Sequence, residues 1–118
     1  LRGHRTALRV FEESDLLFIH KWVNDQKTTR YMFTGQRPLL FEEVEKIYSR
    51  EFSSESNVIF IVEDAVTNKP VGMAGLYDLH FTARKGEFRI LIGESSSRGK
   101  GIGTEATKMV VSIRESGL

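Results

Sequence analysis

The stretch Arg98-Gly99-Lys100-Gly101-Ile102-Gly103 places three glycines and two cations between a predicted strand and a predicted helix. Downstream of it, apolar residues from Ala106 to Ile113 stand at i, i+3, i+4 and i+7, which predicts a one-sided helix over about 101–116. Glycines let a backbone approach a ligand closely, and the first N–H groups of a helix lack intrahelical acceptors. The stretch therefore predicts a turn that binds phosphate at a helix N-terminus.

Two other phosphate-binding patterns do not fit this stretch. A dinucleotide fingerprint needs G-x-G-x-x-G inside a βαβ unit, whereas Gly99, Gly101 and Gly103 are evenly spaced and follow a predicted meander. A P-loop needs Gly-Lys followed by Ser or Thr, but Gly101 follows Lys100. From the pattern alone, a plain strand-to-helix connection with glycines for flexibility remains the alternative.

The rest of the chain predicts a mixed α/β (α+β) domain with the order β-α-α-β-β-β-α. The predicted strands cover 7–11, 58–62, 71–79 and 87–92, and the predicted helices start near 16, 39 and 101. Ser14-Asp15 is a candidate N-cap for the first helix, and a short helical turn is predicted over 27–32. Turns between the last three strands imply an antiparallel meander, with Gly72 and Gly75 allowing close backbone approach or a bulge.

Length and composition describe an ordinary globular domain. We expect residues 1–118 to form a single domain, with 40% hydrophobic and 28% charged residues. A net charge of +1 gives no argument for nucleic acid or an anionic membrane, and no apolar run approaches the roughly 20 residues of a membrane span. The absence of cysteine excludes disulfides, and the three dispersed histidines predict no metal site. A cytoplasmic location is the default expectation.

Residues around the glycine stretch resemble the acetyl-CoA motif of the GNAT superfamily of N-acetyltransferases. Ile92-Gly93-Glu94 is followed by the run 98–106, and Arg98, Gly101 and Gly103 occupy the defined positions of the family signature Gln/Arg-x-x-Gly-x-Gly/Ala. The run Trp22-Val23-Asn24-Asp25 is similar to the ribosomal-protein and amino-sugar branches of that family.

The resemblance implies a fold, a co-substrate and a reaction. It implies a GNAT-like fold, with acetyl-CoA (coenzyme A) as co-substrate and its pantetheine arm beside 91–93. The implied cofactor-binding residues are Leu91, Ile92, Gly93, Arg98, Gly99, Lys100, Gly101, Ile102, Gly103 and Thr104. The implied function is transfer of an acetyl group to a primary amine of a protein N-terminus or a small molecule. The alternative is a non-catalytic coenzyme A-binding or interaction module.

Transfer to an amine needs a base, because amines are protonated at neutral pH. Glu87 is the candidate, since related enzymes often carry a glutamate on this strand; a solvated residue paired with Arg89 or Lys85 is the alternative. Arg30 and Tyr31 are candidates for acceptor binding. Trp22 is interpreted as a core residue rather than part of the acceptor wall, and Glu94 as structural.

GNAT domains normally continue beyond the helix that carries the motif, with a strand, a helix and a hairpin. Because the sequence ends at Leu118, we interpret it as lacking that segment. The predicted strand 87–92 would then be an open edge, which invites pairing with another copy. A homodimer formed by strand or domain exchange is the resulting expectation.

Overall fold

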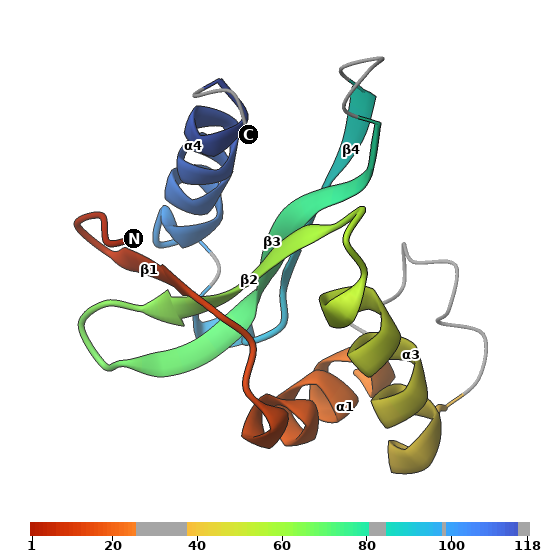
Figure 1. Cartoon of the computed structure of the whole chain (residues 1–118). Coiled ribbons are helices and arrows are strands. Elements are labelled where there is room, and N and C mark those ends of the chain that lie inside the picture. Colours follow the sequence, from red (N-terminus) through yellow and green to blue (C-terminus); the bar gives the residue numbers. More distant parts are fainter. Residues whose placement is uncertain (26–37, 81–84, 98, 116–118) are drawn as a thin grey trace.

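A computed structural model describes residues 1–25, 38–80, 85–97 and 99–115 of the chain (Figure 1). Its elements in chain order are β1 (Thr6–Arg9), η1 (Glu13–Asp15), α1 (Leu16–Asn24), α3 (Phe41–Ser53), β2 (Val58–Asp64), β3 (Lys69–His80), β4 (Lys85–Ile92), η3 (Ser95–Ser97) and α4 (Ile102–Glu115). The predicted order and fold class are confirmed. The predicted turn over 27–32 lies outside the described residues.

The four strands form one sheet in the order β1-β2-β3-β4, and every neighbouring pair is antiparallel. The predicted meander is therefore confirmed. A register shift at Val62/Glu63 marks an irregularity where β2 meets β3. Among the described residues, β4 has a strand partner on one side alone, so the predicted open edge is present. Pairing of that edge with another copy stays a prediction.

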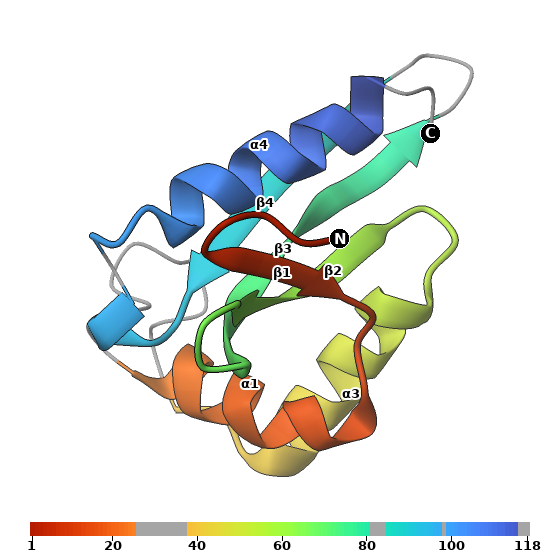
Figure 2. The ribbon, with the colours of Figure 1, turned by 90° about the vertical axis from the view of Figure 1, so that its left-hand side faces the viewer.

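Helices cover both faces of the sheet, with α1 and α3 on one side and α4 on the other (Figure 2). One core cluster joins α4 residues such as Ile102 and Val110 to Val62 and Leu76 of the sheet. The second cluster packs α1 and α3 against the opposite face, where Ile61 is fully buried. Side chains alternate along β2, so Ile61 and Val62 lie on opposite faces of the sheet, each in a different core cluster. This is expected of a strand covered on both faces.

Two glycines of β3 make the close approaches predicted for them. A Cβ on Gly72 would lie 2.0 Å from the Leu91 carbonyl oxygen, and one on Gly75 would lie 2.4 Å from the Val58 carbonyl oxygen. Both contacts are with the backbone of a neighbouring strand, so neither position can accept a side chain without separating strands. These glycines let β3 sit tightly between β2 and β4.

The first strand and the start of α1 differ in detail from the prediction. The strand spans Thr6–Arg9 rather than 7–11, and Asp15 makes no side-chain cap bond to its helix. The Asp15 carboxylate instead accepts two hydrogen bonds from the Arg9 guanidinium, at 2.7 and 2.8 Å, and one from the Glu12 backbone N–H. Asp15 is 2% exposed. A bidentate pair with arginine satisfies a buried carboxylate better than one amide of the helix could.

None of the helices in the described part of the chain combines the length and the apolar character that crossing a bilayer requires.

Candidate functional site

The glycine stretch adopts a conformation that side chains disfavour. Gly99 and Gly101 have φ angles of +80° and +81°, in the left-handed region. A Cβ built on either residue meets no atom within 4 Å, so the described chain leaves the space beside this turn open. Glycine is therefore favoured here by the backbone geometry. The predicted Arg98 lies outside the described residues.

The turn leads directly into the N-terminus of α4. The first hydrogen bond of the helix runs from the Glu105 N–H to the Gly101 carbonyl at 3.0 Å. The N–H groups of 102–104 lie before it and therefore have no acceptor within the helix. Ile102 is fully buried and anchors this end of the helix, whereas the side chains of Lys100 and Thr104 are exposed. An open backbone turn, a helix N-terminus and an exposed lysine suit a phosphate group.

β4 leads from the sheet toward this turn. Leu91 and Ile92 lie opposite Met73 and Gly72 of β3 and are partly exposed. The Gly93 N–H donates to the Val71 carbonyl at 2.7 Å, so this amide is used within the sheet. The predicted pantetheine residues are thus brought next to the glycine turn, at the edge strand of the sheet.

Trp22 and Glu94 hold the base of the turn in place. Trp22 is fully buried, and a Cβ on Gly93 would lie 2.1 Å from its Cγ, so the indole packs on the bare face of the glycine. The indole Nε1 donates to Glu94 at 2.6 Å, and Lys21 Nζ lies 3.1 Å from both carboxylate oxygens of Glu94. The predicted core position of Trp22 is confirmed, and Glu94 has the structural contacts expected of it.

Glu87, the predicted base, is exposed on β4 and accepts a hydrogen bond from Arg89 at 3.0 Å. That hydrogen bond and the charge of Arg89 lower the pKa of Glu87. Arg89 also lies over the Tyr77 ring at 4.5 Å and 3.9 Å from the Asp78 carboxylate. Glu87 is therefore ionised at neutral pH, in contact with the partner that the alternative interpretation named.

A half-buried carboxylate, which sequence reasoning missed, lies near this group. Burial raises the pKa of Glu51 on α3, Asp78 adds to the rise, and Arg89 opposes it. Burial also raises the pKa of Tyr48 to about 12, with Glu51 contributing. Nothing in the local sequence distinguishes Glu51 from the solvated glutamates of the same helix. It lies near Asp78 and Arg89 because α3 belongs to the core cluster that packs α1 on the sheet.

The predicted acceptor residues Arg30 and Tyr31 lie outside the described residues. Asn24 joins the two ends of the segment that contains them. Its amide nitrogen donates to the Leu39 carbonyl at 2.9 Å, and its amide oxygen accepts from the Leu39 N–H at 2.6 Å. The same nitrogen also donates to the His20 carbonyl, which fixes the end of α1. The base of this segment is therefore closed by side-chain hydrogen bonds.

Within the described ranges, no three histidine, aspartate or glutamate side chains come together as a metal site.

Comparison with known proteins matches the acetyltransferase (GNAT) domain family to residues 5–115. A spermidine N(1)-acetyltransferase of Vibrio cholerae is 34% identical over 96 residues, covering 80% of this chain and 53% of that protein. An N-acetyltransferase 9-like protein of Caenorhabditis briggsae is 31% identical over 119 residues, covering 93% and 59%. The chain thus spans little more than half the length of these relatives.

Solved structures share the fold. The crystal structure of Vibrio cholerae spermidine N-acetyltransferase in complex with CoA and spermine superposes with a TM-score of 0.80 at 27% identity, covering 95% of this chain and 64% of that one. A domain from Methanocaldococcus jannaschii gives a TM-score of 0.78 at 24% identity, which shows a likeness of fold.

Proposed function

Because the chain belongs to the GNAT acetyltransferase family, we propose that it carries the coenzyme A-binding part of an N-acetyltransferase that acts on a small primary amine. The glycine turn is the observation that carries this proposal. Gly99 and Gly101 hold φ angles near +80° beside open space, at the N-terminus of α4. Acetyl-CoA, when bound, supplies the acetyl group as an activated thioester.

The residues of the chain divide into a donor side and an acceptor side. On the donor side, backbone N–H groups at the start of α4 would hold the pyrophosphate, with Lys100 adding a positive charge. Main-chain groups of 91–93 would receive the pantetheine arm. Arg98 belongs to the same proposal through its place in the family signature.

Glu87 is the proposed base that takes the proton of the acceptor amine, directly or through water. Its lowered pKa supports a permanently available carboxylate but makes it a weak proton acceptor. General-base catalysis contributes about 10²–10⁴-fold to rate, so a weak base belongs at the lower end of that range. We expect Glu87→Gln to lower kcat by about 100-fold or less, with little change in the affinity for coenzyme A.

The proposed acceptor class is a polyamine. The relatives named spermidine acetyltransferases support it, and so do the Glu51, Asp78 and Glu87 carboxylates, which lie around Arg89. Carboxylates attract a polycation. Arg30 and Tyr31 are proposed to complete the acceptor side.

Calorimetry with coenzyme A followed by thiol release tests the function. We expect binding of coenzyme A and release of thiol from acetyl-CoA with spermidine, at a rate above that with an amino sugar or a peptide N-terminus. Glu45→Gln, an exposed change on α3, is the matched control for Glu87→Gln. Binding without turnover on any amine favours the non-catalytic module, and absence of binding refutes both functions.

A further inference from the structure

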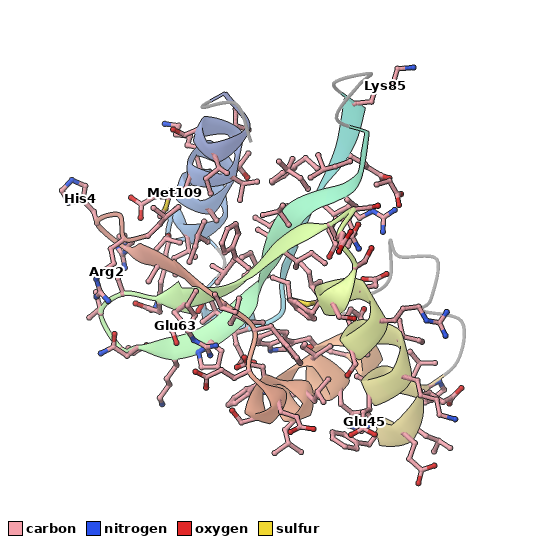
Figure 3. The ribbon with its side chains drawn as sticks, viewed as in Figure 1. Arg2, His4, Glu45, Glu63, Lys85 and Met109 are labelled. Atoms are coloured by element: carbon pink, nitrogen blue, oxygen red, sulfur yellow. The ribbon has the colours of Figure 1, made fainter. Side chains whose placement is uncertain are left out.

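The carboxylate of Glu105 binds the N-terminal turn of the chain to the start of α4. Glu105, in the first turn of α4, accepts the His4 backbone N–H at 3.2 Å and the Arg5 backbone N–H at 3.0 Å. These partners are about one hundred residues away in sequence. Figures 1 and 2 both place the N-terminal turn beside the beginning of α4, and Figure 3 shows His4 on that turn and Met109 on the helix.

A second contact joins the same two segments. The buried Thr6 hydroxyl donates to the Ile102 carbonyl at 3.3 Å, one turn before Glu105. The Glu105 N–H itself closes the first turn of the helix on Gly101. Glu105 therefore connects two segments. Its backbone N–H binds the glycine turn, and its carboxylate binds the amides that immediately precede β1.

Gly3 shows how closely the carboxylate is fitted to this turn. A Cβ on Gly3 would lie 2.3 Å from Glu105 Oε1 and 2.4 Å from its Cδ. A side chain at this position would push the carboxylate away from the His4 and Arg5 amides. The chain thus offers two independent ways to release the same contact, one of which leaves Glu105 itself unchanged.

The direction of the carboxylate matters for the neighbouring anion site. An acidic side chain in the first turn of a helix commonly interacts with the amides of that helix. Here the Glu105 carboxylate is bonded to the amides of another segment. Hydrogen bonds from Arg5, Thr6 and His4 together outweigh the desolvation that opposes them and lower the pKa of Glu105. The negative charge is thereby held by the N-terminal turn rather than by the first amides of α4.

We infer that Glu105 is a positioning residue for coenzyme A: its carboxylate holds the first turn of α4 against the N-terminal turn, so that the amides after Gly101 are fixed for phosphate. This inference rests on the proposed coenzyme A site. It requires that releasing the carboxylate weakens coenzyme A binding even when the chain stays folded.

The test compares Glu105→Ala, Glu105→Gln and Gly3→Ala with Glu45→Ala, an exposed glutamate-to-alanine change on another helix. Coenzyme A affinity is measured by calorimetry well below the unfolding temperature of each variant. Hydrogen exchange of the 102–105 amides is measured in parallel, without ligand. We expect Glu105→Ala and Gly3→Ala to raise the Kd about tenfold, equivalent to about 1.4 kcal/mol. Amide protection in the first turn should fall with them.

Glu105→Gln should recover part of the affinity, because its amide oxygen can still accept one backbone N–H. Glu45→Ala should leave the Kd within about twofold. A Glu105→Ala chain that unfolds at a lower temperature but binds coenzyme A as tightly as wild type overturns the inference and leaves the proposed function standing. A wild-type chain that fails to bind coenzyme A overturns the proposed function instead.

Discussion

Replacing Gly93 by alanine tests the contact that joins the sheet to α1. The new Cβ would lie 2.1, 2.3 and 2.6 Å from three ring atoms of Trp22, which has no exposed surface. Carbon atoms rest about 3.6 Å apart, so the indole must retreat by about 1.5 Å. A buried ring has no space for that movement, and overpacking of this kind costs about 1–3 kcal/mol. We expect the upper value, about 3 kcal/mol.

The assay is urea and thermal unfolding followed by tryptophan fluorescence and circular dichroism. For a chain of this length, a loss of about 3 kcal/mol lowers the unfolding temperature by about 12 °C. Gly103→Ala is the matched control, because its Cβ would meet Ile92 at 3.6 Å, an ordinary contact. Since alanine favours a helix over glycine, we expect the control to be stabilised by up to about 1 kcal/mol.

A double-mutant cycle identifies the cause of the loss. Trp22→Ala removes the only tryptophan of the chain, so this background is followed by circular dichroism alone. The change should cost about 3–5 kcal/mol, because it leaves a cavity. In that background the methyl group of Gly93→Ala enters empty space, so its cost should fall by about 2–3 kcal/mol. Equal costs of Gly93→Ala with and without the indole, or an unfolding temperature within 2 °C of wild type for Gly93→Ala alone (roughly the effect of 0.5 kcal/mol), would refute the reasoning.

Three further changes report on other parts of the fold. Gly101→Ala puts a side chain at φ +81° but meets no atom, so we expect a loss of about 1 kcal/mol in urea unfolding, opposite in sign to Gly103→Ala. Arg9→Met leaves the buried Asp15 carboxylate without its guanidinium partner, and we expect it to lower the unfolding free energy by about 2 kcal/mol. This is less than the cost of breaking a fully buried pair, because Arg9 is partly exposed. An unchanged midpoint of urea unfolding would contradict this. Folding raises the pKa of Tyr48 from 10.0 to about 12, so the contribution of its neutral phenol to stability is present below pH 10 and is lost between about pH 10 and 12. The unfolding free energy therefore falls with pH over that range. Tyr48→Phe should reduce the slope of this fall by up to about 1.4 kcal/mol per pH unit.

The features that sequence could predict are those whose cause is local. Gly99 and Gly101 can be recognised because the residue type itself permits positive φ, and α4 because apolar residues repeat along one helix. The meander followed from turn signals between β-branched runs. Each of these predictions depends on residues within one element or its neighbour.

The features that sequence could not predict are choices among distant partners. Asp15 could cap α1 or bind Arg9, and the three-dimensional position of β1 decides for Arg9. Glu105 looks like any acidic residue in a first helical turn, yet its partners are the amides of His4 and Arg5. Glu51 acquires its raised pKa only through the packing of α3. No periodicity or spacing in the sequence encodes these contacts.

The hydrogen bonds between Asn24 and Leu39 bear on how sequence changes in residues 26–37 affect the rest of the chain. The two hydrogen bonds join the end of α1 to Leu39 and are made by residues outside 26–37. Under the proposed function, changes within 26–37 alter the acceptor side, whereas the proposed coenzyme A turn lies on other elements. Selection, or a protein engineer, would then change the acceptor while the coenzyme A site stays constant.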